Sequence, residues 1–289
     1  MKRAQTDGTP RVNPATGGTG TGNPATGSTR TGERAAGATP VVSASNVFAS
    51  YDRAPVLVDL TFSLQPGQLI AIVGPNGAGK STLFKLLTGI KRPDSGSLRV
   101  LGDSVHMSRR ANRIAYVPQE ADIDWDYPIF VRDVVMSGRF GRMRQDGFLR
   151  KFLPPRFAGA EHHRRVDEAL EAVDMSSQAH RPIGGLSGGQ KKRVFLARAI
   201  AQEADLLLLD EPLAGVDRVT ESLFFEVLGN LIAKGKSVIM ISHDLPTVQA
   251  KADTALLISR TVIEIGPPAQ TMTQECMERA YHSVRRAQQ

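Results

Sequence analysis

An unbroken apolar run that enters a glycine-rich loop restricts the fold of this chain more than any other feature. Residues 69–73 (LIAIV) are all apolar, residues 74–82 read GPNGAGKST, and residues 83–87 carry apolar side chains at helical spacing. A parallel strand that is buried on both faces has such a continuous apolar sequence. Strand, glycine turn and helix in this order predict an α/β fold with a phosphate-binding loop.

The glycine loop contains the residue types that hold nucleotide phosphates. Its amides can surround a β-phosphate, the Lys80 ammonium can neutralise β- and γ-phosphate oxygens, and the Ser81 hydroxyl can ligate Mg²⁺. Thr82 is expected to add a hydrogen bond to phosphate. An ordinary glycine turn, the alternative, would need neither the lysine nor the hydroxyls. The nucleotide contacts predicted in this loop are Gly74, Pro75, Asn76, Gly77, Ala78, Gly79, Lys80, Ser81 and Thr82.

Two carboxylates follow a second apolar run, residues 206–209. In open α/β sheets ligands bind at the carboxyl ends of the strands, so Asp210 is expected to hold Mg²⁺ through water, and Glu211 to polarise the attacking water. His243 follows another apolar run and is expected to reach the γ-phosphate, and Gln119 to reach Mg²⁺ or the water. A helix-capping glutamate and a surface histidine are the alternatives.

Residues 186–190 (LSGGQ) add a second half of a binding site. Paired glycines let the backbone approach an anion, and Ser187 offers a hydroxyl just before a basic helix that is expected to start near Gln190. The N-terminus of a helix attracts phosphate, because its free N–H groups and the helix dipole favour negative charge. The predicted contacts are Ser187, Gly188, Gly189 and Gln190.

Together these motifs resemble the ATP-binding-cassette (ABC) ATPases, in the expected order over residues 43–270. The resemblance implies a P-loop NTPase core with a mostly parallel sheet flanked by helices, an antiparallel β subdomain and an inserted helical subdomain. It implies that Tyr51 stacks on adenine, with a plain strand aromatic as the alternative, and that Gln119 is the Q-loop glutamine. Asp217 resembles the aspartate of the loop that crosses the dimer interface, and His243 resembles the switch histidine.

The resemblance also implies a homodimer with ATP and Mg²⁺ as cofactors. Two copies would face each other head to tail, so that Ser187 of one copy meets the γ-phosphate held by Lys80 of the other. ATP would then favour closure, and hydrolysis would remove the contacts that hold the closed state. Hydrolysis is therefore expected to be cooperative and to depend on the dimer.

Composition divides the chain into three parts. Residues 1–40 contain a near repeat (NPATGGTGTG, NPATGSTRTG) and few large apolar side chains, so we predict a disordered tail, with an unknown docking role as the alternative. Residues 41–270 are the predicted nucleotide-binding domain, with the helical subdomain at about 120–190, and residues 271–289 are a C-terminal helical extension.

Apolar periodicity predicts the individual elements of the domain. Strands are expected at residues 42–48, 56–64, 69–73, 97–101, 113–117, 205–210, 237–242, 255–258 and 262–265. Helices are expected at residues 80–88, 131–137, 162–173, 190–201, around 223–231, and near 274–286.

The formal net charge of +7 suits nucleic acid or an anionic membrane surface, but much of the excess lies in the tail and in residues 139–165. We interpret that stretch as a solvated basic face, with contact to anionic headgroups as the alternative. Cys276 is the single cysteine, which fits a reduced compartment, and no run approaches the roughly 18 apolar residues of a membrane helix. His162 and His163 lack a spaced set of further metal ligands.

A single cassette without a membrane span or long heptads favours a separate importer subunit at the cytoplasmic face of the cell membrane. Residues 122–141 are similar to the region after the Q-loop in ATPases of manganese, zinc and iron importers. An integral membrane permease and an extracytoplasmic metal-binding protein are the expected partners, and no nucleic-acid partner is expected. Another cargo, such as haem or a siderophore, and a non-transport ATPase associated with nucleic acid are the alternatives. Four residues either receive a permease helix or pack the helical subdomain: Trp125, Tyr127, Pro128 and Phe130.

Overall fold

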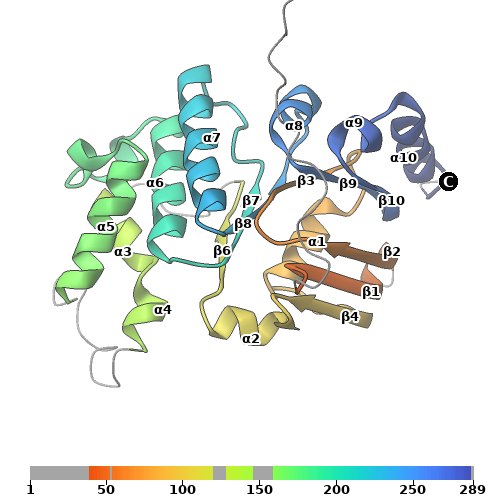
Figure 1. Cartoon of the computed structure of the whole chain (residues 1–289), viewed down its shortest axis with the longest axis horizontal. Coiled ribbons are helices and arrows are strands. Elements are labelled where there is room, and N and C mark those ends of the chain that lie inside the picture. The colour runs from red at the N-terminus through yellow and green to blue at the C-terminus, as the bar shows by residue number, and fades with distance from the viewer. Residues whose placement is uncertain (1–38, 53, 120–127, 146–158, 288–289) are drawn as a thin grey trace, which may run out of the picture. The chain divides into compact units, whose positions relative to one another are not determined.

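Two β-sheets and the helices around them make up the fold (Figure 1). The structure is a computed structural model that describes residues 39–52, 54–119, 128–145 and 159–287. Residues 37–289 belong to one compact unit. Nearly all of the predicted tail lies outside the described residues, as do Trp125 and Tyr127. The predicted α/β fold with a mostly parallel sheet is confirmed.

The larger sheet has six strands in the order β10-β9-β3-β8-β7-β6. All neighbours pair in parallel except β10, which is antiparallel to β9. Side chains of β3 alternate between two buried apolar clusters, so both faces of the sheet are covered and its central strands are apolar throughout. The strands are β3 (Leu69–Val73), β6 (Ile114–Val117), β7 (Leu206–Asp210), β8 (Ser237–Ile241), β9 (Thr254–Ser259) and β10 (Thr261–Gly266).

The smaller sheet is the predicted antiparallel subdomain, with four strands in the order β2-β1-β4-β5. Helix α1 (Lys80–Leu87) buries its apolar side chains in the cluster that this sheet shares with one face of the larger sheet. The phosphate loop therefore lies between two rigid layers. The strands are β1 (Val42–Tyr51), β2 (Ala54–Leu64), β4 (Ser95–Val100) and β5 (Asp103–Ser104).

The other apolar cluster joins the opposite face of the larger sheet to a group of helices, which stand together in Figure 1. The group comprises α3 (Val131–Ser137), α4 (Phe140–Met143), α5 (Ala160–Ala172), α6 (Gly188–Ala201) and α7 (Arg218–Ala233). Helix α10 (Gln274–Ala287) packs against β9, where the Ser259 hydroxyl donates to the Ala280 carbonyl at 2.6 Å. None of the described helices is both long and apolar enough to cross a bilayer.

Short helices are where the sequence reasoning failed. It missed α2 (Val105–Arg110), α4, α8 (Leu245–Lys251) and α9 (Pro268–Thr271). Helices with so few residues show little periodicity, and local contacts such as caps decide whether they form. The Ser104 and Asp244 side chains cap α2 and α8. Helix α6 starts at Gly188 rather than near Gln190, because Ser187 is its N-cap.

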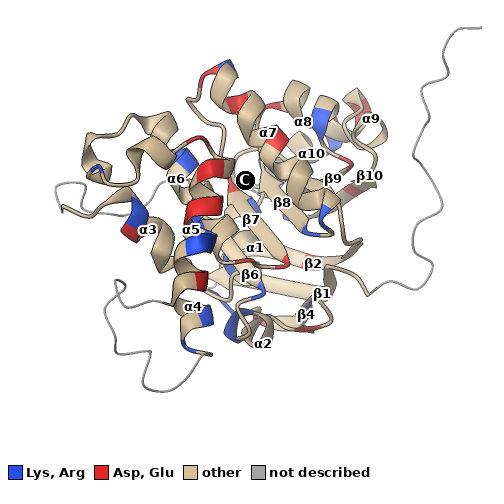
Figure 2. Ribbon diagram, turned by 60° about the vertical axis from the view of Figure 1, so that its left-hand side comes forward, with Lys and Arg blue, Asp and Glu red and all other residues tan. Residues whose placement is uncertain are grey.

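The basic stretch is only partly the solvated face that we expected. Arg139 is 3% exposed, and its guanidinium donates to the Ala201 carbonyl at 2.6 Å, to Glu203 at 2.5 Å and to His162 Nδ1 at 3.2 Å. A buried charge needs such partners, which the sequence could not show. On α5, basic and acidic residues lie side by side (Figure 2), and Arg165 pairs with Glu161, Glu168 and Glu203.

Candidate nucleotide-binding and hydrolysis site

The phosphate loop connects β3 to α1. Two of its glycines are required because a larger side chain would clash with neighbouring parts of the same chain. A Cβ on Gly74 would lie 2.2 Å from the Ile258 carbonyl oxygen, and one on Gly79 would lie 2.4 Å from Leu57 Cδ2. Their φ angles are 152° and 93°, and that of Gly77 is 80°. Only glycine adopts this backbone without strain. The loop conformation is thus imposed by the sheets around it.

Lys80 bends back over the loop that precedes it. Its ammonium donates to the carbonyl oxygens of Gly74 at 2.7 Å and Pro75 at 3.0 Å. Burial lowers the pKa of Lys80, while the charges of Glu211 and Asp210 oppose that shift. Ser81 is exposed, whereas Thr82 is 7% exposed within α1. The ammonium is therefore placed where it can neutralise an anion in the loop.

Asp210 and Glu211 lie at the carboxyl end of β7, beside the end of β8. Burial, and next the charge of Glu211, raise the pKa of Asp210. The Tyr116 hydroxyl of β6 donates to Asp210 Oδ2 at 3.4 Å, and burial followed by this carboxylate raises the pKa of Tyr116 to about 12. A buried carboxylate whose charge is disfavoured by a neighbouring carboxylate makes a site that favours a cation.

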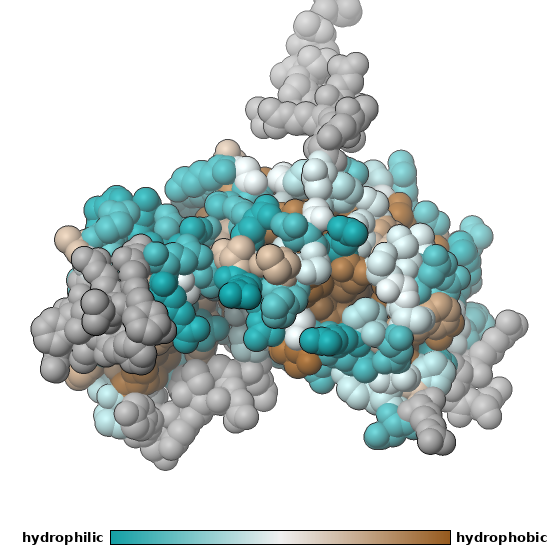
Figure 3. Space-filling model, turned by 90° about the horizontal axis from the view of Figure 1, so that it is seen from below, coloured by the Kyte–Doolittle hydropathy of each residue, from teal (hydrophilic) through white to brown (hydrophobic). Residues whose placement is uncertain are grey.

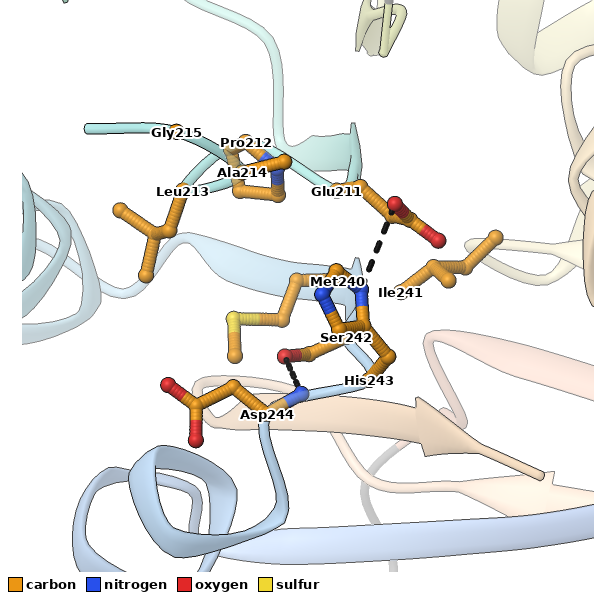
Figure 4. Close-up of a pocket in the computed structure, with 10 residues that line it drawn as sticks. All are labelled: Glu211, Pro212, Leu213, Ala214, Gly215, Met240, Ile241, Ser242, His243 and Asp244. Carbon is orange, nitrogen blue, oxygen red and sulfur yellow. Dashed lines mark hydrogen bonds and ion pairs between the residues drawn. The ribbon is translucent and has the colours of Figure 1, made fainter. Parts of the chain in front are cut away.

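The Glu211 side chain contacts two other residues that the sequence predicted for the site, Gln119 and His243. Gln119 Nε2 donates to Glu211 Oε2 at 2.9 Å, and His243 Nδ1 lies 3.4 Å from the same oxygen (Figure 4). The backbone of Glu211 has a φ of 45°, which is uncommon for a residue other than glycine. Such a conformation persists only where the surroundings hold it, and it occurs often at functional sites. A small pocket lies beside Glu211 and His243, and both residues line it.

These residues fit Mg²⁺, which takes oxygen ligands. Ser81 supplies a hydroxyl, Gln119 an amide oxygen and Asp210 a carboxylate whose ionisation a cation would favour. Mg²⁺ held by these residues would supply positive charge beside the phosphates of the nucleotide. The Mg²⁺ ligand set stays a prediction.

The LSGGQ segment forms a complete capping box at the start of α6. The Gln190 backbone N–H donates to Ser187 Oγ at 3.3 Å, and the Ser187 backbone N–H donates to Gln190 Oε1 at 2.9 Å. Because Ser187 Oγ accepts this bond, its own hydrogen is still available for a phosphate. Among the described residues, no hydrogen bond or ion pair joins residues 187–190 to the phosphate loop.

Asp217 is the N-cap of α7, and it lies beside the start of α6. It accepts from the Thr220 backbone N–H and the Thr220 hydroxyl, both at 2.9 Å. These bonds hold the pKa of Asp217 below its ordinary value. A Cβ on Gly189 would lie 3.6 Å from Thr220 Oγ1 and 3.9 Å from Asp217 Oδ2. The sequence reasoning missed the cap, although an aspartate just before an amphipathic run is a recognisable signal of a helix start.

Tyr51 ends β1 and is 41% exposed. The ammonium groups of Lys91 and Lys85 lie 4.9 Å and 5.5 Å from its ring centroid. Cations at this distance are attracted to an aromatic ring. The ring is therefore held at the surface near α1 and does not pack into the core. Phe130, at the start of α3, is also exposed, at 46%.

Known proteins are similar to this chain in sequence and fold. The family model "ABC transporter" matches residues 57–214. The manganese transport system ATP-binding protein MntB of Halalkalibacterium halodurans is 42% identical over 242 residues, which cover 84% of this chain and 92% of that protein. The zinc transport system ATP-binding protein TroB of Treponema pallidum is 42% identical over 240 residues, or 83% of this chain and 86% of that protein.

A solved structure, described as an inward-facing conformation of a putative metal-chelate type ABC transporter, superimposes with a TM-score of 0.71 at 28% identity. The match covers 84% of this chain and 90% of that one. Sequence, fold and the order of the phosphate loop, the LSGGQ segment and the acidic strand end all agree, and this chain belongs to the ABC transporter family as one of its nucleotide-binding, ATP-hydrolysing cassettes.

Proposed function

We propose that two copies of this chain close around ATP and Mg²⁺ and thereby drive uptake of a divalent metal ion through a separate membrane permease. The cassettes work at the cytoplasmic face of the membrane, and an extracytoplasmic binding protein delivers the metal. The nucleotide-binding domain spans residues 41–270, with its helical part at about 120–190. Residues 1–40 form a tail and residues 271–289 a C-terminal extension.

The main support for the proposed dimer is the presence of two glycines, Gly188 and Gly189, at the start of α6. Neither has a positive φ, and nothing lies within 4 Å of a Cβ placed on Gly188. Glycine within a helix costs up to about 1 kcal/mol relative to alanine, so the fold of one chain would favour alanine here. A ligand that approaches the helix backbone from outside explains both glycines, and the phosphate held by a second copy is such a ligand.

In this proposal each copy supplies one half of each site. The phosphate loop with Lys80 and Thr82 holds the phosphates, and Tyr51 stacks on the adenine. Ser81, Asp210 and Gln119 hold Mg²⁺. Glu211 polarises the attacking water and His243 contacts the γ-phosphate. The LSGGQ segment and Asp217 of the other copy close the site.

Relatives support a metal ion as the cargo. Proteins named for manganese and zinc transport are 42% identical to this chain over more than four fifths of its length. A metal chelate is the second candidate, because a relative from Yersinia pestis, 42% identical, is named for chelated iron transport and a similar structure for metal chelates. Uptake of Mn²⁺, Zn²⁺, Fe²⁺ and an iron chelate by the complex reconstituted with its permease separates these possibilities.

Exposed apolar side chains support docking to a permease. Besides Phe130, Met107 of α2 is 55% exposed and Phe140 of α4 is 42% exposed. The molecule seen from below shows apolar residues in several separate spots on a largely hydrophilic face (Figure 3). Phe130→Ala is expected to weaken permease binding while basal ATP hydrolysis is kept. Unchanged permease binding would remove Phe130 from the docking surface.

The dimer is tested with Glu211→Gln, which should slow hydrolysis and trap the closed state. With ATP and Mg²⁺ the variant is expected to elute as a dimer in size-exclusion chromatography with light scattering, and as a monomer without nucleotide. Lys80→Ala in the same background is the matched control and should remain monomeric, because it cannot hold the γ-phosphate. A Glu211→Gln protein that binds ATP tightly but stays monomeric contradicts the proposal.

A further inference from the structure

Lys192, in the second turn of α6, reaches the segment that follows Glu211. Its ammonium donates a hydrogen bond to the carbonyl oxygen of Ala214. The Ala214 backbone N–H in turn donates to the Glu211 carbonyl at 3.3 Å. Ala214 therefore links Lys192 to Glu211 through its two backbone polar groups. It also lines the pocket beside Glu211 and His243 (Figure 4).

The environment of Lys192 is unusual for a lysine on a helix surface. The side chain is partly buried, and among the described residues it forms no salt bridge. Burial lowers the pKa of Lys192, and the charge of Glu211 is the favourable influence that opposes this shift. A half-buried ammonium loses hydration, so a carbonyl and a nearby carboxylate are the groups that compensate it.

Glu211 needs support from this side. Its positive φ is a strained backbone conformation, and Gln119 and His243 contact only its side chain. Its backbone is held by the Glu211 N–H bond to the Ile241 carbonyl at 3.2 Å and by the bond from Ala214. Lys192, on α6, bonds to Ala214 and so helps to hold the residue that makes the second of these two bonds.

We infer that Lys192 is a positioning residue for hydrolysis, which ties the helix that begins with the LSGGQ segment to the backbone of Glu211 in the same chain. This inference rests on the proposed role of Glu211 as the residue that polarises water. It also gives a physical connection between the two half-sites of one copy. When the start of α6 is drawn toward a partner's nucleotide, the Ala214 carbonyl moves with it.

The test compares Lys192→Met, which keeps the length of the side chain, with Lys192→Arg, which keeps the charge and the donor. Lys192→Met is expected to lower kcat roughly tenfold, part of the ~10²–10⁴-fold that a positioned general base contributes. KM for ATP and the ATP-dependent dimer should be unchanged. Lys192→Arg should restore most of the rate. Lys234→Met, an exposed lysine after α7, is the matched control and should behave as wild type.

A double-mutant cycle with Glu211→Gln separates positioning from general damage. If Lys192 acts through Glu211, Lys192→Met should not lower the residual rate of Glu211→Gln any further. An equal loss in both backgrounds, a raised KM, or a wild-type rate for Lys192→Met overturns the inference while leaving the proposed role of Glu211 intact. Wild-type hydrolysis by Glu211→Gln would instead refute the role of Glu211 itself.

Discussion

The phosphate loop and the LSGGQ segment both place glycines at the start of a helix, but for different physical reasons. Gly74 and Gly79 are required by their own chain, since a Cβ at either position would collide with β9 or β2 and the backbone has positive φ. Gly188 and Gly189 have ordinary helical geometry, and no atom lies within 4 Å of a Cβ placed on Gly188. The glycines of the phosphate loop are thus required by their own chain, whereas the fold of one chain does not require those of the LSGGQ segment.

Lys80→Ala should give the largest effect. Removing the ammonium leaves the phosphates without their main cation, so the hydrolysis rate should fall by roughly 10²–10³-fold or more, as for other groups that stabilise transition-state charge. The measurement is the steady-state ATPase rate, with Lys234→Ala as the control. Substantial hydrolysis by Lys80→Ala would show that the phosphate loop is not the half-site that holds the γ-phosphate.

The same substitution at two glycines tests the comparison directly. Gly74→Ala should lower the free energy of unfolding by about 1–3 kcal/mol, because of the clash with the Ile258 carbonyl and the strained φ. Gly188→Ala should leave that free energy unchanged or raise it by up to about 1 kcal/mol, yet slow ATP hydrolysis roughly 10²-fold. Urea unfolding and ATPase assays measure the two quantities. A fully active Gly188→Ala would mean that no ligand approaches this helix start.

Ionisation of Asp210 and ionisation of Asp217 should change the free energy of unfolding in opposite directions. The pKa of Asp210 is raised by burial and by Glu211, so its ionisation destabilises the folded chain, and Asp210→Asn should increase the free energy of unfolding at neutral pH. The pKa of Asp217 is lowered by hydrogen bonds from Thr220, so Asp217→Ala should decrease the free energy of unfolding at neutral pH. The difference at Asp210 should shrink as the pH falls through its raised pKa toward about 4, and the difference at Asp217 should shrink only as the pH falls below about 4. Equal signs at neutral pH, measured by urea unfolding, would contradict this difference.

Removal of residues 1–36 should have the smallest effect. Every residue of both half-sites lies after this segment, and residues 37–289 form a compact unit by themselves. ATP hydrolysis and the thermal midpoint of the shortened chain should therefore match those of the full chain. A lower ATPase rate would assign the repeated tail a part in the dimer.

The sequence by itself determined the central strands and the longer helices, and it indicated which segments are candidates for the two half-sites. These follow from local chemistry: runs such as Leu69–Val73 must be buried on both faces, and a glycine loop with Lys80 needs no distant partner to be identified. The sequence also placed Gln119, Glu211 and His243 at strand ends, where parallel strands bring them together.

Only the tertiary structure decided how those side chains are held. The bond from Tyr116 to Asp210 and the link from Lys192 to Ala214 join residues far apart in the chain, and Glu211 has a left-handed backbone conformation. Arg139 became buried because Glu203, Ala201 and His162 converge on it from other elements. Composition and periodicity report which residues must leave water, but orientation and partners depend on long-range packing, which no local pattern encodes.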